Sequence, residues 1–356
     1  MTAVQSSPDD PERTPVRFAV VGLDHAHVHG QIAGLVAAGA VFAGRAGPSS
    51  PVHDAVARQW PEVPLVADPG QLLDDPSIDL VVTAAVPAER AGIAVAALTA
   101  GKDVVTDKPG CTTPDQLARI EAVVAASGRF WSVTFSERFE VRAVSRAGEL
   151  VRAGRIGRVV QTLGVGPHRL DAPTRPDWFF RRESYGGILT DIASHQIDQF
   201  LWFTGLTDAE VMWSTAANVG HPEHPGLQDF GEVVLRGGRG DTGEAHGYVR
   251  VDWFTPDGLP VWGDGRLTIL GTEGYLELRK YVDPTGAPGG DHLICVDGAG
   301  MERIDCSDAP LPYYPALVAD VRDRTTTACP QQHTFTVMRL ALQAQADADE
   351  RGRMRG

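Results

Sequence analysis

Short apolar runs alternate with helix-forming stretches through the first 136 residues, and this alternation constrains the fold more than any other feature of the chain. The segment Thr113-Pro114-Asp115-Gln116 shows the pattern clearly, because it combines an N-cap threonine, a proline at the first helical position and a capping-box glutamine. Strands joined by crossover helices form a parallel sheet that is covered on both faces. We therefore expect residues 16–136 to form an α/β, doubly wound, Rossmann-type dinucleotide-binding domain. The predicted strands are residues 16–21, 41–43, 63–67, 79–83, 103–106 and 130–135.

The rhythm changes after residue 136, where longer alternating strands are separated by turns such as Gly237-Gly238-Arg239-Gly240. This pattern predicts an α+β domain over residues 137–356 with a mostly antiparallel, open sheet that serves substrate binding and oligomerisation. Residues 1–15 are expected to be a disordered tail. The expected strands are residues 159–164, 231–235, 245–254, 266–270 and 274–280, and the expected helices are 144–153, 188–204 and 336–349, with an irregular stretch at 166–184.

The charge balance limits the possible partners. The 356 residues include 46 acidic and 32 Lys or Arg side chains, which gives a formal net charge of −14. Such a chain repels phosphate backbones and anionic lipid, so neither nucleic acid nor a membrane surface is an expected partner. The four cysteines form no CxxC pair, and the chain shows no signal-peptide pattern and no run of about 18 apolar residues. We expect a soluble cytoplasmic protein.

The segment Gly22-Leu23-Asp24-His25-Ala26-His27 lies where a dinucleotide fingerprint belongs, after the first strand and before the first helix. Of the three glycines in that pattern, Gly22 alone is present, because Asp24 and His27 take the other two positions. We expect Gly22, Leu23, Asp24 and His25 to contact a cofactor, and the alternative is an ordinary turn with Asp24 as the helix N-cap. A metal site at His25, His27 and His29 is not expected, because alternating residues diverge at a helix entry and no carboxylate or cysteine cluster adjoins them.

Two further segments are candidates for cofactor contact. The second predicted strand is followed by Arg45 and two serines instead of an acid, which slightly favours NADP over NAD, since arginine can accept a 2′-phosphate. The alternative is a solvated arginine. Asp107-Lys108-Pro109 follows the fifth predicted strand, at the sheet edge where ligands bind in such folds. Ala84, Ala85 and Pro87, after the strand at 79–83, are also expected to contact the cofactor.

The strongest local pattern runs from Gly186 to Asp198. On one helix, Asp191, His195 and Asp198 are spaced i, i+4 and i+7, so they form an acid–imidazole–acid row opposite the apolar side. Asp191 could orient and charge-stabilise His195 for proton transfer. The alternative is a solvated polar face, which spacing alone does not exclude.

These motifs together resemble the Gfo/Idh/MocA family of oxidoreductases over residues 16–348. Asp107-Lys108-Pro109 is similar to the family's Glu-Lys-Pro motif, with Asp in place of Glu, and Gly186–Asp198 is similar to its GG…D…H…D helix. The other similar segments are Gly154-Arg155-Ile156-Gly157, Trp178-Phe179 and Gly271-Thr272-Glu273-Gly274.

The resemblance implies an NAD or NADP cofactor and a sugar, polyol or related hydroxyl or carbonyl substrate. It implies that Lys108 contacts both, that Asp191 assists, and that His195 is the acid/base. Arg138, His168, Arg169 and Trp178 are expected to line the substrate side. It also implies a dimer or tetramer, which the open C-terminal sheet would suit.

Three alternatives stay open at this point. One is an NAD-dependent glycoside hydrolase of the same family, and another is a non-catalytic nucleotide or sugar sensor with a degraded cofactor loop. The third, which the two-domain layout disfavours, is a metal-dependent hydrolase built on His25-Ala26-His27.

Overall fold

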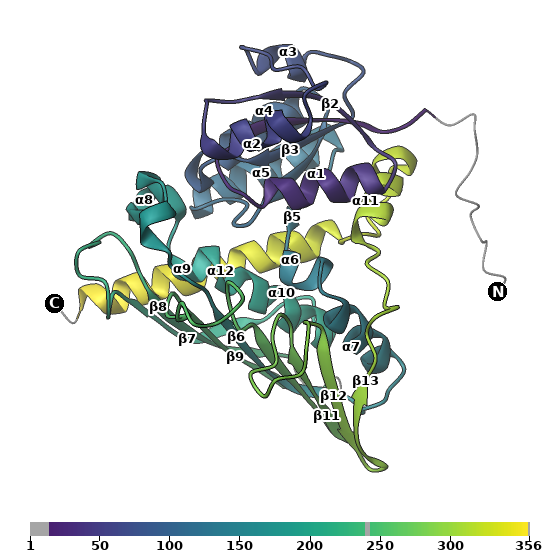
Figure 1. Cartoon of the computed structure of the whole chain (residues 1–356), viewed down its shortest axis with the longest axis vertical. Helices are drawn as coiled ribbons and strands as arrows, with labels where there is room; N and C mark the ends of the chain where they lie inside the picture. Colours follow the sequence, from purple (N-terminus) through teal and green to yellow (C-terminus); the bar gives the residue numbers. More distant parts are fainter. Residues whose placement is uncertain (1–13, 239–242, 355–356) are drawn as a thin grey trace.

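The computed structural model describes residues 14–238 and 243–354. Two β-sheets lie at opposite ends of the molecule, with helices between and around them (Figure 1). Most of the expected tail at 1–15 and part of the expected turn at 237–240 fall outside the described residues. Within the described ranges, no helix combines the length and the apolar character needed to cross a lipid bilayer.

The first sheet is parallel and has the strand order β2-β1-β3-β4-β5. This order is that of a doubly wound fold, with a topological switch point between β1 and β3. The strands are β1 (Arg17–Leu23), β2 (Val41–Ala46), β3 (Leu80–Ala84), β4 (Asp103–Asp107) and β5 (Trp131–Thr134). The helices are α1 (Val28–Ala37), α2 (Pro51–Gln59), α3 (Gly70–Leu73), α4 (Pro87–Thr99) and α5 (Pro114–Ser127).

Two local expectations for this domain have clear outcomes. The predicted strand at 63–67 is wrong: the segment makes a single bridge between Leu65 and Arg45, because Pro64 has no N–H to extend a ladder. The predicted start of α5 is confirmed, since the Thr113 hydroxyl accepts a hydrogen bond from the Gln116 amide at 3.2 Å. Helices α2 and α3 were not expected.

The second sheet has eight strands in the order β13-β12-β11-β10-β6-β9-β8-β7. All neighbours are antiparallel except β6 and β9, so the predicted mostly antiparallel sheet is confirmed. The strands are β6 (Val159–Pro167), β7 (Glu210–Ala217), β8 (Phe230–Gly237), β9 (Ala245–Asp252), β10 (Arg266–Gly271), β11 (Gly274–Arg279), β12 (His292–Asp297) and β13 (Gly300–Ile304). Of these, β7, β12 and β13 were not expected.

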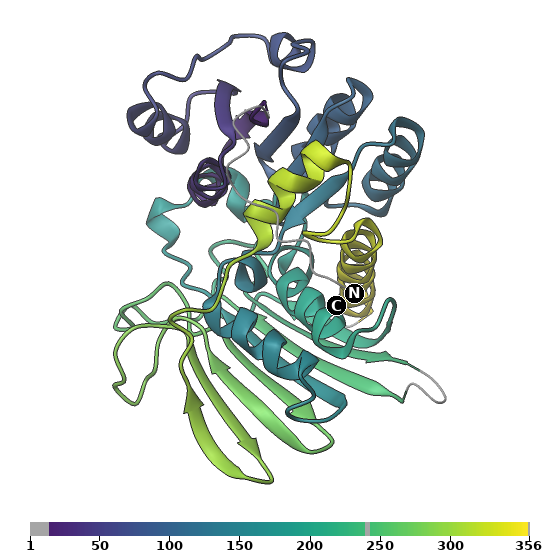
Figure 2. The same cartoon turned by 90° about the vertical axis from the view of Figure 1, so that its right-hand side faces the viewer.

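Helices cover the side of this sheet that faces the first domain, and its other side is open (Figures 1 and 2). They are α6 (Ser136–Phe139), α7 (Arg142–Arg152), α9 (Ile188–Asp191), α10 (Ala193–Thr204) and α12 (Gln331–Arg353), with short turns η1 (Ala172–Thr174), η2 (Asp177–Phe180) and α8 (Arg182–Tyr185) in the irregular stretch. Helix α11 (Tyr313–Asp323) lies beside the first domain instead (Figure 1). The long α12 runs between the two sheets, in contact with α10 below it and with α5 and β5 above it (Figure 1). The α11 helix, which was not expected, packs on α1. The domain boundary at residue 136 stays a prediction.

The predicted single helix at 188–204 is divided at Ile192 into α9 and α10. The break places Asp191 at the end of one helix and His195 in the first turn of the next. Asp191, His195 and Asp198 are all buried, so a solvated polar face is excluded for this row. Asp191 meets Lys108 of the first domain, whereas Asp198 meets Arg138 and His333 of the second.

Candidate active site

An ion pair connects the two domains at the carboxyl edge of the parallel sheet. The Lys108 ammonium, just after β4, lies 2.8 Å from Oδ1 of Asp191 at the end of α9. Both residues are buried: 3% of the surface of Lys108 and 7% of the surface of Asp191 are exposed to solvent. Two residues 83 positions apart in the chain therefore meet as a buried charged pair.

The His195 imidazole lies close to this pair and is also buried. Its ring centroid is 6.4 Å from that of Phe135, and its Nδ1 has no hydrogen-bond partner among the described residues. Burial holds the pKa of His195 well below its usual range, and the positive charge of Lys108 lowers it further. The imidazole is therefore neutral at pH 7. The expected orientation of His195 by Asp191 is wrong, because the Asp191 carboxylate accepts its hydrogen bond from Lys108 instead.

Asp198, the third member of the predicted row, belongs to a separate cluster. It accepts hydrogen bonds from Arg138 Nε at 2.6 Å and from Nη2 at 2.7 Å, and His333 of α12 lies 2.8 Å away. The bidentate contact between Arg138 and Asp198 pairs the guanidinium with the carboxylate inside the protein. The expectation that Arg138 lines the substrate side is therefore not met, since its guanidinium is committed to Asp198.

The other predicted substrate residues lie around the pair in different roles. The His168 ring packs 4.3 Å from that of Trp262, and its Nδ1 contacts the Gly166 carbonyl at 3.1 Å. Arg169 donates to main-chain carbonyls of the loop at 256–261, so it shapes that loop instead of facing the site. The Trp178 ring is 6.4 Å from that of His25 and brings the irregular stretch against the first domain.

The main chain of the expected cofactor loop is hydrogen-bonded to the end of β3. Gly22 has a positive φ of 80°, and a Cβ there would overlap Ala85, so glycine is required. The amides of Asp24 and His25 both donate to the Ala84 carbonyl, at 3.0 and 2.9 Å. These are amides that a glycine-rich loop would offer to a pyrophosphate. The alternative of Asp24 as an N-cap is wrong, because His27 holds that position and no side chain caps the helix.

The remaining expected cofactor contacts have mixed outcomes. Arg45 is buried and donates to the Val63 carbonyl, so it is neither solvated nor free to meet a 2′-phosphate. Leu23 accepts a hydrogen bond from the Ser50 hydroxyl at 2.8 Å, which ties the loop to the start of α2. Ala85 and Pro87 lie at the β3–α4 turn, on the same carboxyl edge as Lys108.

Arg90 is a residue that the sequence reasoning missed. Its fully buried guanidinium donates to the carbonyls of Ala85, Asp107 and Pro109 at 2.7 to 3.0 Å, and it lies 3.2 Å from Oδ2 of Asp107. It therefore holds the turn that presents Lys108. The sequence offers no signal for this role, since an arginine in an amphipathic helix is ordinarily solvated.

The histidines of the loop do not diverge as expected. The Nδ1 atoms of His25 and His27 lie 2.8 and 3.0 Å from the two carboxylate oxygens of Asp107. Burial lowers the pKa of His25 to about 4. The expectation that no carboxylate adjoins these histidines is wrong, because β4 brings Asp107 to them from 80 residues away.

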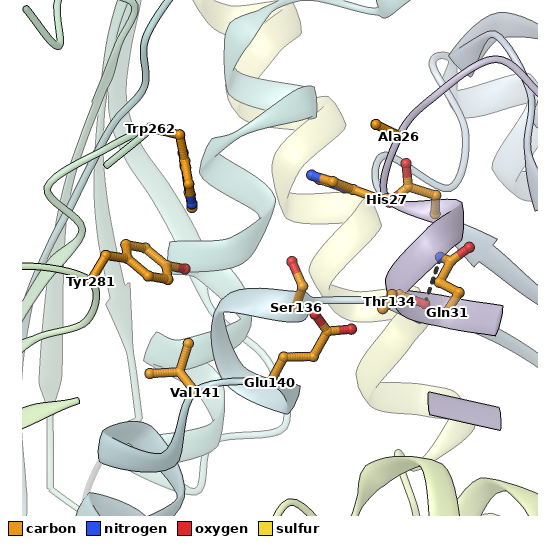
Figure 3. Close-up of a pocket in the computed structure, with 11 residues that line it drawn as sticks. Ala26, His27, Gln31, Thr134, Ser136, Glu140, Val141, Trp262 and Tyr281 are labelled. Atoms are coloured by element: carbon orange, nitrogen blue, oxygen red, sulfur yellow. Dashed lines mark hydrogen bonds and ion pairs between the residues drawn. The ribbon is translucent and has the colours of Figure 1, made fainter. Parts of the chain in front are cut away.

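A cavity of about 320 Å³ opens between the domains beside Asp107. Figure 3 shows Trp262 and Tyr281 on one side and His27 and Gln31 on the other, with Ser136 and Glu140 between them. Lys108, Asp191 and His195 are not in its lining, whereas Asp107, the residue before Lys108, is. The sequence reasoning missed Trp262, Tyr281 and Glu140, which come from unremarkable loop and helix segments.

The comparisons with known proteins agree with this architecture. Residues 16–135 match the oxidoreductase family with an NAD-binding Rossmann fold, and residues 144–277 match the GFO/IDH/MocA C-terminal domain. A protein of Erwinia carotovora atroseptica SCRI1043, described as an oxidoreductase, has a crystal structure that superposes with a TM-score of 0.89 at 47% identity, covering 94% of this chain and 98% of that one.

Two curated relatives match over shorter stretches. The uncharacterised oxidoreductase YdgJ of Escherichia coli (strain K12) is 33% identical over 158 residues, which is 44% of this chain and 45% of the relative. Levoglucosan dehydrogenase of Pseudarthrobacter phenanthrenivorans (strain DSM 18606 / JCM 16027 / LMG 23796 / Sphe3) is 30% identical over 213 residues, 55% and 53% of the two chains. The chain thus spans about half the length of these curated relatives. With both domains matched in the same order, the chain belongs to the Gfo/Idh/MocA family of oxidoreductases.

Proposed function

We propose that this chain is an NAD(P)-dependent dehydrogenase that acts on a hydroxyl group of a sugar or polyol. The observation that carries the proposal is the convergence of Lys108, Asp191 and His195 at the carboxyl edge of the nucleotide-type sheet. An ammonium ion and a neutral imidazole, both shielded from water, are the groups that alcohol oxidation requires.

The cofactor supplies the hydride acceptor, and the protein residues handle the charge and the proton. Neutral His195 takes the proton of the substrate hydroxyl. The Lys108 ammonium stabilises the negative charge that develops on that oxygen, and Asp191 holds the ammonium in place at 2.8 Å. The residues at the carboxyl edge fit a dinucleotide, because Gly22 lets β1 turn closely over Ala85 and a cavity opens along the same edge.

The cavity lining supports a neutral polyhydroxylated substrate. Ser136, Thr134 and Glu140 offer hydroxyl and carboxylate oxygens, and the Trp262 and Tyr281 rings offer flat apolar faces. Sugars present hydroxyls on one side and C–H groups on the other, so this combination suits them. The levoglucosan dehydrogenase relative, whose name specifies a sugar derivative, supports the same class.

For the cofactor, we propose a modest preference for NADP(H). The end of β2 carries no acid to repel a 2′-phosphate, and α2 begins there with its positive N-terminal end. The buried Arg45 does not contribute.

A thermal-shift titration with both nicotinamide pairs tests this proposal. At 100 times its dissociation constant, a bound cofactor stabilises the fold by about 2.7 kcal/mol, so we expect a rise in Tm of several degrees, larger with NADP(H). Adenosine alone is the control. No shift with either pair would contradict the dehydrogenase and favour the non-catalytic sensor, and a cleaved glycoside without net NADH would favour the hydrolase.

We also propose that the chain forms a dimer or tetramer through the open side of its second sheet. Leu163, Leu270 and Tyr275 are each about two-fifths exposed and line one shallow hollow on adjacent strands β6, β10 and β11. Contiguous apolar surface of this kind marks interfaces. In light scattering, Leu270→Glu should shift the wild-type oligomer to smaller species, and a monomeric wild type would contradict the assignment.

A cytoplasmic location is our last proposal for the chain. Cysteines 111, 295, 306 and 329 are all free and buried, as suits a reducing compartment. Fractionation of cells that express the chain checks this location.

A further inference from the structure

Three potential metal ligands meet in the loop whose sequence departs from the glycine pattern. One ring nitrogen each of His25 and His27 and a carboxylate oxygen of Asp107 all lie within 4.8 Å of one another. Asp107 is completely buried, and the two imidazole rings stand nearly perpendicular, with centroids 4.2 Å apart. Within the described ranges, no other group of three His, Cys, Asp or Glu side chains meets these conditions.

Hydrogen bonding accounts for the Asp107 carboxylate, whose Oδ1 accepts from the Lys108 amide at 2.8 Å and whose Oδ2 accepts from Arg90 Nη2 at 3.2 Å. It does not account for the His25 ring. The His27 Nδ1–H donates to Oδ1 of Asp107 at 3.0 Å. Nδ1 of His25 lies 2.8 Å from Oδ2, yet it has no partner in hydrogen-bond geometry and is closed to solvent. Two potential metal-ligating atoms that lie close together without a hydrogen bond between them are typical of side chains that coordinate one metal ion.

We propose that His25, His27 and Asp107 bind one divalent transition-metal ion, of which Zn²⁺ is the representative. Two imidazole nitrogens and one carboxylate oxygen are an established donor set for such ions. A tetrahedral ion with bonds of about 2.0–2.1 Å needs donors roughly 3.3 Å apart, which the observed spacing reaches with small side-chain rotations. The site lies in the segments that we assign to the cofactor, but metal analysis tests it without any dehydrogenase activity. The proposal replaces the sequence-based expectation of no metal.

The fourth position of the ion faces the interdomain cavity. His27 and Asp107 both line that cavity, so water or an oxygen atom of a small ligand can complete the coordination. The Asp24 and His25 amides already donate hydrogen bonds to the Ala84 carbonyl, so they are not available to a ligand. The ion therefore supplies the positive charge that the loop withholds, and an oxygen ligand from the cavity, such as water or a hydroxyl group, suits it.

The local charges accommodate a dication. Of the two nearby cations, the Lys108 ammonium is held by Asp191, and the Arg90 guanidinium binds main-chain carbonyls as well as Oδ2 of Asp107. The Glu140 carboxylate lines the same cavity and adds negative charge. Arg90 donates to Oδ2 of Asp107 at 3.2 Å, and a partner of this kind orients a metal ligand.

Metal analysis of the tag-free full chain tests the proposal. After dialysis against a chelator and then against Zn²⁺, the wild type should hold about one ion per chain, and Co²⁺ should give the visible absorption of a four-coordinate site. His25→Asn and His27→Gln should each lower the affinity for the metal ion. The loss should exceed the roughly 10–100-fold that follows when only a hydrogen-bond partner of a ligand is removed.

His29→Gln is the matched control, because His29 is partly buried in α1 and contacts Gln59 at 3.3 Å instead of the cluster. It should keep the wild-type stoichiometry. Far-UV circular dichroism checks folding, and if His25→Asn does not fold, the half-exposed His27 decides the outcome. Less than about 0.1 ion per wild-type chain, or an unchanged stoichiometry in His27→Gln, would overturn the site.

Discussion

Replacing His195 by asparagine should lower turnover by about 10²–10⁴-fold while leaving cofactor affinity within about twofold. The imidazole is buried beside Lys108 and is neutral, so it is the group that can take the hydroxyl proton. Asparagine keeps a polar side chain of similar size and lacks a titratable nitrogen. Steady-state kinetics with the best substrate from a sugar and polyol screen measures the loss, and a thermal-shift titration measures cofactor binding.

The lowered pKa of His195 also predicts how turnover depends on pH. A group whose pKa is lowered stays neutral to lower pH, so oxidation by the wild type should persist below the usual histidine pKa of about 6.5 and fall only in more acidic buffer. His246→Gln, at a half-exposed histidine on β9, is the control and should change neither the rate nor the profile. Unchanged turnover in His195→Asn would remove His195 from the mechanism.

Replacing Lys280 by methionine should destabilise the protein by about 3–5 kcal/mol, because it leaves a charge without its partner in the core. The Lys280 ammonium is buried 2.5 Å from Oε2 of Glu137, and the Gln196 side-chain amide donates to the same oxygen at 2.9 Å. Gly164 and Gly166 of β6 have no side chains where Gln196 lies, so the sheet is built to admit this network.

Urea unfolding measures this loss, with two comparison variants. The double variant Lys280→Met/Glu137→Gln should recover part of the stability, because it removes the uncompensated charge. Arg339→Met breaks the exposed pair with Glu121 and should cost less than about 1 kcal/mol. If Lys280→Met were no more harmful than Arg339→Met, the buried pair would not contribute as we describe.

Much of the fold could be predicted from local signals. The alternation of strand and helix in the first half identified all five strands of the parallel sheet, and the capping pattern at Thr113 identified the start of α5. The failure at residues 63–67 is also local, since Pro64 breaks the ladder. Strand β13 was missed because it is the edge strand of the sheet, where it is largely exposed and has no apolar alternation.

The candidate site was predicted less completely, because its contacts join distant segments. Lys108, Asp191 and His195 were identified from motifs, yet the partner of Asp191 was assigned to the neighbouring His195 instead of Lys108. Helical spacing describes one element at a time and cannot show what another domain brings to it. The same limit hid Arg90 beneath Asp107 and Trp262 across the cavity.

The sequence by itself determined the order of the two domains, the family and the residue types at the sheet edge, because these follow from local periodicity and short motifs. Tertiary structure alone decided which charges meet. It assigned Asp191 to Lys108, Asp198 to Arg138, and Asp107 to His25 and His27. The physical reason is that a buried charge must find its partner wherever packing places one, and packing depends on the whole chain rather than on the neighbouring residues.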